Sequence, residues 1–261
     1  MIDAARDIQS VISFYDDLAP QYDAMTGFGQ RFAKEEPVLK QFISQFGIKT
    51  ALDAGSGSGF YSLLLSRIGV EVTAVDISSK MLDLLRKHSA ELGLAVKTVE
   101  SDFADLASVI DSPFDAVFCV GNSLPHITSK EELHQAAESF HRIIRSDGIL
   151  CIQILNYDRI VKLKERIQSI KEVAGKTFIR FYDFGQDILT FSILMIEHTE
   201  RGIQHQLNSV TLRPILQAEL IEVLTDHGFT GIESFDSFTL HPFNAETSRD
   251  LIMIARNKRN T

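Results

Sequence analysis

A glycine-rich turn between two short apolar runs constrains the fold of this chain more than any other feature. The segment Thr50–Phe60, TALDAGSGSGF, closes one apolar run and holds Gly55, Gly57 and Gly59, and the next run, Val70–Asp76, ends in a carboxylate. Glycines at such a turn let the backbone approach a ligand where a Cβ would collide. An acid at the end of the second strand can accept hydrogen bonds from both hydroxyls of an adenosine ribose. The pattern predicts strand, glycine loop, helix and strand around a nucleotide cofactor.

The spacing of the glycines selects among nucleotide cofactors. The GxGxxG pattern that cradles a pyrophosphate would need glycine at position 60, where this chain has Phe60. A nicotinamide-dependent oxidoreductase is therefore the least favoured alternative. Asp53 precedes the glycines, and a carboxylate there suits a cationic ligand group such as those of S-adenosylmethionine better than a phosphate.

Composition excludes several function classes. The chain has 261 residues, 44% of them hydrophobic, which suffices for one large domain or a domain with an insertion. Its formal net charge of −9 argues against long nucleic acid as a substrate, because nucleic-acid binders cluster Lys and Arg. Cys119 and Cys151 lie in apolar runs, as buried thiols in a reducing compartment do. We expect a cytoplasmic protein with no signal segment, no membrane span and no metal site.

Apolar strands alternate with amphipathic helices from about position 50 to 155, which is typical of a parallel sheet. The prediction is an α/β fold with a doubly wound, seven-stranded, mostly parallel sheet. Helices are expected to begin at Ser78 or Ser79, Ser129 and Pro214, and Asp147-Gly148 to turn into a strand. Beyond the first two, strands are expected at Val96–Val99, Phe114–Val120, Ile149–Leu155, Ile232–Leu240 and Leu251–Ala255.

The rhythm of strands and helices breaks between Asn156 and Arg213. Three strand-like runs, separated by turns at 185–187 and 200–202, cover Phe178–Phe184, Leu189–His198 and Ile203–Leu212. An insertion after the fifth strand would lie over the carboxyl ends of the strands, where open α/β sheets bind ligands. We expect a helical cover at 1–48, a core at 49–156 and 214–261, and an antiparallel lid at 157–213; a dimerisation arm is the alternative for the last of these.

The motif residues carry a family resemblance. Leu52–Gly59 and Val75–Asp76 resemble the first two motifs of the class I S-adenosylmethionine-dependent methyltransferases. Val120–Ile127, VGNSLPHI, is similar to a GNS-x-x-H run in glycine and sarcosine N-methyltransferases, and Asn156-Tyr157-Asp158 and the pair Tyr15-Asp16 and Tyr22-Asp23 recur there too. The resemblance implies methyl transfer to a small molecule, with N-methylation favoured. An O-methyltransferase and a non-catalytic S-adenosylmethionine-binding protein are the alternatives, and a homodimer is expected.

The resemblance also implies which residues form the site. Asp53 and the glycines border the methionine half of the cofactor, Asp76 holds the ribose, and Asp102 and Phe103 contact the adenine, although Asp102 also fits a helix cap. Asn122, His126 and Tyr22 are the candidate catalytic residues, with a purely structural role as the alternative for His126. The full set expected to bind cofactor is Asp53, Ala54, Gly55, Gly57, Gly59, Asp76, Ile77, Met81, Asp102, Phe103, Val120, Tyr22 and Arg31.

One position departs from the pattern of the N-methyltransferases. They have an arginine just before the Asn-Tyr-Asp triplet that holds the carboxylate of the amino acid, and this chain has Leu155. Losing a bidentate guanidinium removes binding of ~1.5–3 kcal/mol or more. Glycine is therefore not the expected acceptor unless Arg180 or Arg213, both in the insertion, supplies a cation; each also fits a solvated strand charge.

Overall fold

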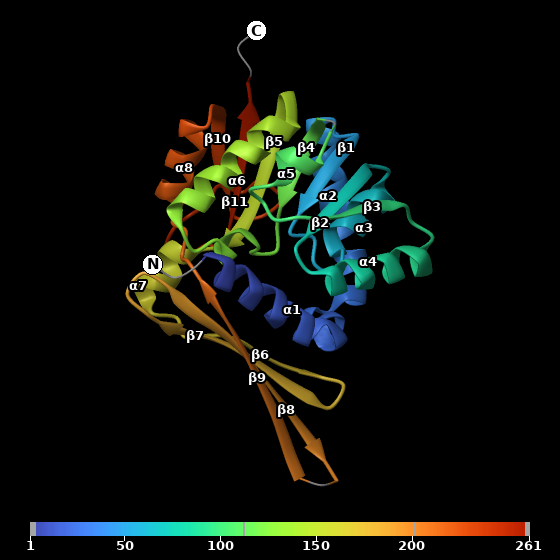
Figure 1. Ribbon diagram of the computed structural model, residues 1–261, viewed down its shortest axis with the longest axis vertical. Helices are drawn as coiled ribbons and strands as arrows, with labels where there is room; N and C mark the ends of the chain where they lie inside the picture. Colours follow the sequence, from blue (N-terminus) through green and yellow to red (C-terminus); the bar gives the residue numbers. More distant parts are fainter. Residues whose placement is uncertain (1–3, 112, 201, 259–261) are drawn as a thin grey trace.

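Two β-sheets of different size organise the molecule (Figure 1). The structure is a computed structural model that describes residues 4–111, 113–200 and 202–258. The larger sheet has seven strands in the order β10-β11-β5-β4-β1-β2-β3, and β11 is antiparallel to both of its neighbours while the other pairs are parallel. Its strands are β1 Thr50–Ala54, β2 Glu71–Asp76, β3 Val96–Glu100, β4 Phe114–Cys119, β5 Ile144–Leu155, β10 Phe229–Phe235 and β11 Asp250–Asn257. The predicted doubly wound sheet is confirmed.

Helices on both faces of this sheet bury two apolar clusters. One cluster joins α2 (Phe28–Phe46) and α3 (Phe60–Ile68) to one face, and the other joins α6 (Lys130–Ile143) and α8 (Gln217–Asp226) to the opposite face. Successive β residues point to opposite faces, so a strand buried on both, such as β4 with its FDAVFC sequence, is apolar along nearly its whole length. The remaining helices are α4 Ser79–Leu92, α5 Leu106–Val109, the 3₁₀ turn η1 Leu124–His126 and α7 Tyr157–Leu163.

The smaller sheet is antiparallel, in the order β6-β7-β8-β9. Three of its strands, β7 Lys176–Phe184, β8 Leu189–Thr199 and β9 Gly202–Leu212, fall where the sequence predicts them. The fourth, β6 Ile167–Val173, was not predicted, because it is an edge strand with Ile167 and Ile170 exposed and therefore lacks a clean apolar face. The predicted turn at 200–202 includes Arg201, which lies outside the described residues.

The N-terminal helix α1 (Ala4–Thr26) lies between the two sheets (Figure 1). Asp16 accepts a hydrogen bond from the Ser78 hydroxyl (2.7 Å) and pairs with Lys80 (3.3 Å), which fixes the middle of α1 to the start of α4. Near the end of α1, Asp23 lies 2.8 Å from the His88 ring of α4. Through these contacts α1 covers the carboxyl ends of β1 and β2.

Three predicted boundaries are corrected by tertiary contacts. Strand β5 begins at Ile144, directly after α6, and Asp147 (φ 63°) forms an irregularity inside it where a turn before it was expected. Helix α8 begins at Gln217 and not at Pro214, because the Asp158 carboxylate accepts from the Gln217 N–H (3.0 Å) and caps the helix there. Strand β10 spans Phe229–Phe235, so the predicted end at Leu240 lies beyond it, where the backbone has φ 60°.

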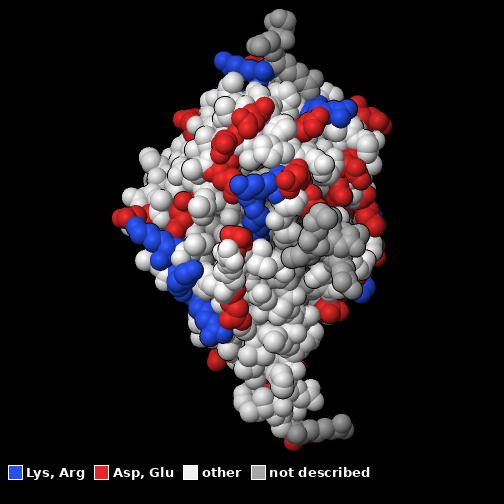
Figure 2. Space-filling model, turned by 60° about the vertical axis from the view of Figure 1, so that its left-hand side comes forward, with Lys and Arg blue, Asp and Glu red and all other residues white. Residues whose placement is uncertain are grey.

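Surface charge is mixed. Figure 2 shows acidic and basic side chains interspersed over the main body, while the β8–β9 hairpin, which projects at the bottom, carries few charges on this face. Within the described ranges, no helix has the length and apolar character that crossing a membrane requires.

Candidate active site

A cavity of about 770 Å³ lies at the carboxyl ends of β1, β2 and β4, under α1 and the smaller sheet. Small-molecule sites have volumes of roughly 300–1,000 Å³. Twelve of the fifteen predicted site residues line it: Tyr22, Arg31, Asp53, Gly55, Gly57, Asp76, Ile77, Asp102, Phe103, Val120, Asn122 and His126. Motifs that are 100 residues apart in sequence therefore meet in one cavity.

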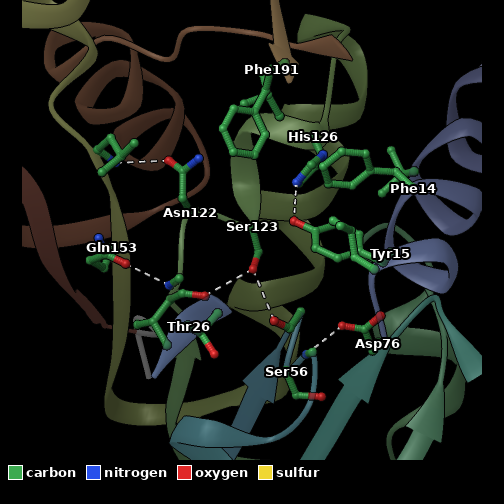
Figure 3. A pocket seen from close by; sticks show the side chains of 18 of the residues that line it. Phe14, Tyr15, Thr26, Ser56, Asp76, Asn122, Ser123, His126, Gln153 and Phe191 are labelled. Atoms are coloured by element: carbon green, nitrogen blue, oxygen red, sulfur yellow. Dashed lines mark hydrogen bonds between the residues drawn. The ribbon is translucent and has the colours of Figure 1, made fainter. Parts of the chain in front are cut away.

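The glycine loop packs tightly against the loop after β4 (Figure 3). A Cβ at Gly55 (φ 75°) would lie 2.6 Å from the Ser123 Cβ, so only glycine fits there. The Ser123 hydroxyl lies within hydrogen-bond distance of the carbonyl oxygens of Gly55 and Val120, 3.1 Å from each. Gly57 (φ 53°) faces open space instead, with the Tyr22 hydroxyl 3.7 Å from the site of its missing Cβ. The loop is thereby held with one side open to the cavity.

Asp76 is oriented by backbone amides. Its Oδ2 accepts from the Gly57 N–H (2.8 Å) and its Oδ1 from the Ser78 N–H (2.9 Å), as Figure 3 shows for the first of these. Burial is the main influence on its pKa and raises it, and these hydrogen bonds oppose that shift. Each carboxylate oxygen keeps a further acceptor position, so the group can still accept from two adjacent hydroxyls.

Asp53 has an unsatisfied acceptor. Its side chain is 1% exposed, and Oδ2 accepts from the Ser62 hydroxyl (2.5 Å). Oδ1 has no hydrogen-bond partner among the described residues. Burial raises the pKa of Asp53 to about 7. A ligand ammonium near Oδ1 would supply the missing partner and favour the charged form, so the residue fits the amino end of S-adenosylmethionine.

Asp102 and Phe103 follow β3 at the cavity wall. The Asp102 Oδ1 accepts a hydrogen bond from the Asp105 N–H (2.8 Å). Asp102 therefore has the capping role that the sequence offered as the alternative to adenine binding. The same residue lines the cavity, and one cap hydrogen bond leaves its second oxygen available. Phe103 lines the cavity too and packs edge-on against Phe140, with ring centroids 5.9 Å apart.

The amide of Asn122 is engaged within the protein. Its Oδ1 accepts from the Leu155 N–H (3.0 Å), and its Nδ2 donates to the Tyr157 hydroxyl (3.0 Å). Asn122 has φ 66°, a left-handed conformation that asparagine tolerates better than most residues. These contacts tie the loop after β4 to the end of β5, and they leave one N–H of the amide for a ligand.

His126 contacts the covering helix. Its Nε2 lies 2.8 Å from the Tyr15 hydroxyl of α1, a contact that Figure 3 shows at the cavity wall. Burial lowers the pKa of His126 to about 4, so the ring is neutral at neutral pH. Its Nδ1 has no partner among the described residues. A neutral imidazole of such low pKa is a weak base, and its contact with Tyr15 gives it a role in positioning α1.

Tyr22 and Arg31 enter the cavity from the N-terminal helices. Tyr22 packs edge-on against Tyr15, with centroids 6.1 Å apart, and burial raises its pKa. The Arg31 guanidinium lies 4.0 Å from the centroid of the Phe60 ring and 2.7 Å from Glu35. Aromatic rings and a guanidinium thus meet near the glycine loop, where both a sulfonium and a carboxylate of a ligand find complementary groups.

Three of the predicted cofactor residues do not line the cavity. Ala54 and Met81 are buried at 0% exposure, with their side chains in the protein interior. Gly59 (φ 90°) precedes α3, and a Cβ there would lie 2.4 Å from the Leu85 Cγ. Glycine is required at position 59 because α3 and α4 pack closely there. The sequence motif alone does not distinguish this requirement from contact with a ligand.

Several cavity residues were not predicted from the motifs. Gln153 interrupts the apolar β5 near its carboxyl end; its Oε1 accepts from the Gly121 N–H (2.7 Å) and its Nε2 donates to Asp250 (2.9 Å). A polar residue inside an apolar strand is the sequence signal that could have revealed it. The insertion adds Tyr182 and Phe191 to the cavity, together with Arg180, which is one of the two candidate cations from the sequence. They lie on alternating positions of β7 and on β8, and only their shared sheet face brings them together.

Comparison with known proteins agrees with this geometry. Residues 51–148 match the family described as "Methyltransferase domain". The chain is 30% identical over 148 residues to the glycine/sarcosine N-methyltransferase of Aphanothece halophytica, covering 57% of this chain and 56% of that protein. It is 22% identical over 228 residues to the enzyme of the same name from Parasynechococcus marenigrum, covering 86% and 78%. The first match spans only about half of the relative's length.

A solved structure shows the same fold over nearly the whole chain. An S-adenosylmethionine-dependent methyltransferase from Clostridium acetobutylicum superimposes with a TM-score of 0.78 at 15% identity, covering 94% of this chain and 99% of that one. The domain match over 51–148, the relatives and this fold together support a class I S-adenosylmethionine-dependent methyltransferase. The same findings support S-adenosylmethionine as the cofactor.

Proposed function

We propose that this protein transfers the methyl group of S-adenosylmethionine to the nitrogen of a small-molecule amine. The observation that carries the proposal is the similarity to two glycine/sarcosine N-methyltransferases, one of them over 86% of this chain. The domain match covers 51–148 alone, and the substrate is therefore inferred from the relatives.

The cavity has the groups that this reaction needs. Asp76 would hold the ribose, Asp53 the ammonium and Arg31 the carboxylate of the cofactor, with Asp102 and Phe103 at the adenine. When bound, the cofactor supplies an electrophilic methyl group. The protein then contributes orientation and exclusion of water, since an in-line displacement needs an amine lone pair close to the methyl and little proton transfer before it.

The catalytic residues act mainly through position. Asn122 would direct its free N–H into the acceptor side, and Tyr22 would present an aromatic face to the positive charge. His126 is too weak a base at neutral pH to remove a proton from an ammonium, so we expect the acceptor to react as the neutral amine.

The organisation of the chain supports a cover over the site. We propose that 1–48 and 157–213 act as a cover and a lid on the core at 49–156 and 214–261, because residues from both line the cavity. The exposed Ile203 and Leu207 on β9 suit contact with a second copy, so a homodimer is also proposed. The net charge of −9 and the mixed surface charge support a small acceptor and not long nucleic acid. The two buried free cysteines support a cytoplasmic location.

The test is turnover with defined acceptors. The full chain is incubated with S-adenosylmethionine and a panel of primary and secondary amines, each matched to an alcohol of the same skeleton. S-adenosylhomocysteine and the methylated product are measured by mass spectrometry. Methylation of amines alone is expected. Methylation of the alcohols would make the protein an O-methyltransferase, and cofactor binding without product from any acceptor would make it a non-catalytic binding protein.

A further inference from the structure

Strand β7 of the smaller sheet places one arginine between two aromatic side chains on the side that faces the cavity. Phe178, Arg180 and Tyr182 alternate along this strand and so share one face of the sheet. Phe178 and Tyr182 are each 1% exposed, and Arg180 lines the cavity between them. Removing a charged guanidinium from water without a partner is unfavourable. A guanidinium among aromatic side chains therefore indicates that a partner pairs with it.

Arg180 has no carboxylate partner among the residues that the structure describes. Its Nη2 donates a hydrogen bond to the backbone carbonyl of Met25, at 3.3 Å. Burial is the main cause that lowers the pKa of Arg180; Tyr22 and Tyr15 oppose this shift, and the charges of Arg31 and Arg249 add to it. Arg180 is thus a half-buried cation that is influenced by two other cations of the same cavity.

The other buried or half-buried arginines differ in this respect. Arg31 is 2.7 Å from Glu35, Arg159 is 3.1 Å from Glu165, and Arg213 pairs with Glu219. Arg213, the second candidate cation from the sequence, is therefore neutralised within the protein. Among these four arginines of the described residues, Arg180 alone has no carboxylate beside it, so its guanidinium can still pair with an anionic ligand group.

A second unsatisfied group faces Arg180 across the strands. Ser169 of β6 is the direct antiparallel partner of Arg180, so both side chains leave the same face of the sheet. The Ser169 Oγ is buried and has no hydrogen-bond partner among the described residues, and Ser169 lines the same cavity. A guanidinium and a hydroxyl side by side form a donor pair that suits a carboxylate.

We propose that Arg180 and Ser169 form a subsite on the smaller sheet that binds a carboxylate of the methyl acceptor, so that the substrate is an amine that also carries a carboxylate. The inference rests on the proposed methyl transfer to nitrogen. One guanidinium and one hydroxyl match the single charge of a carboxylate. The subsite would take the place of the arginine that Leu155 replaces, from a strand of the smaller sheet.

The test compares acids with their amides. The full chain, saturated with S-adenosylhomocysteine, is titrated by calorimetry with sarcosine and sarcosinamide, glycine and glycinamide, and β-alanine and β-alaninamide. Each pair keeps the amine and removes the negative charge. At least one acid is expected to bind ten or more times tighter than its amide. Arg180→Met should weaken acid binding about 10- to 100-fold and amide binding little, with partial retention in Arg180→Lys and a smaller loss in Ser169→Ala.

Arg166→Met is the matched control, because Arg166 lies in the same lid, is exposed and pairs with Asp183 (2.6 Å). It should leave acid binding unchanged. Three results would overturn the proposal: no acid binds to the wild-type complex, the preference for an acid survives in Arg180→Met, or Arg180→Met weakens S-adenosylhomocysteine as strongly as the acid. The third result would assign Arg180 to the carboxylate of the cofactor.

Failure of the carboxylate subsite can be distinguished experimentally from failure of the proposed methyl transfer. If wild-type protein methylates amides and acids equally well, methyl transfer to nitrogen stands and the carboxylate subsite falls. If S-adenosylhomocysteine does not bind, the proposed function itself falls.

Discussion

Replacing Asp76 by alanine should remove most of the affinity for the cofactor. Its carboxylate is held by two backbone amides, at 2.8 and 2.9 Å, and can accept from both ribose hydroxyls. A hydrogen bond to a charged group contributes about 1.5–3 kcal/mol. Losing two, with incomplete additivity, should cost about 3–5 kcal/mol, or roughly a 10²- to 10⁴-fold rise in the dissociation constant of S-adenosylhomocysteine measured by calorimetry.

The Asp76→Ala variant also leaves two amides without their acceptor, so its stability needs a matched control. Asp115 is a second buried acid that accepts from two backbone amides, Lys49 N–H (2.7 Å) and Thr50 N–H (3.1 Å), but at the opposite ends of the strands. Asp115→Ala should lower the free energy of unfolding comparably, by about 1–3 kcal/mol, and leave cofactor affinity unchanged. A folded Asp76→Ala variant that binds within threefold of wild type would refute the ribose assignment.

Three further perturbations test the site and its support. Because burial raises the pKa of Asp53 to about 7 and a ligand ammonium favours its charged form, S-adenosylhomocysteine affinity should rise about tenfold from pH 6 to pH 8, and stay flat in Asp53→Asn. The stability of the ligand-free protein should depend on pH in the opposite direction. Protonated Asp53 stabilises the fold at low pH, and calorimetric melting should show this stability being lost as pH rises through about 7. The Asp53→Asn variant should not show this loss. Tyr15→Phe leaves the His126 ring without its 2.8 Å partner and should cost about 1–3 kcal/mol in urea unfolding; no change would mean that the contact does not hold α1. Gly59→Ala should lower the free energy of unfolding by several kcal/mol more than Gly69→Ala. Both glycines have positive φ, but only at Gly59 would a Cβ lie 2.4 Å from a side-chain carbon. Equal losses of stability in the two variants would contradict a packing role for Gly59.

The sequence predicts the large sheet well because its signals are local. The glycine loop, the acid that ends β2 and the caps at Ser78 and Ser129 each depend on residues within a few positions, and the structure confirms both caps. Edge strand β6 escaped prediction because none of its residues is fully buried and its apolar residues do not alternate as those of a half-buried strand do.

Residues of the site that depend on distant partners could not be predicted in this way. The donor pair of Arg180 and Ser169 arises from the register of β6 on β7, which the sequence does not specify. The amide of Asn122 is fixed by Leu155 and Tyr157, more than 30 residues away. The motif predicted where Asn122 lies, whereas its hydrogen bonds decide how much of its amide is free for a ligand.

The most direct test of the account is calorimetric titration of the full chain with S-adenosylmethionine, S-adenosylhomocysteine and NAD, repeated with Asp76→Ala. We predict one site that binds both adenosyl ligands, strong loss of that binding in the variant, and no binding of NAD. Binding of NAD, or no binding of either adenosyl ligand to the wild-type protein, would contradict it.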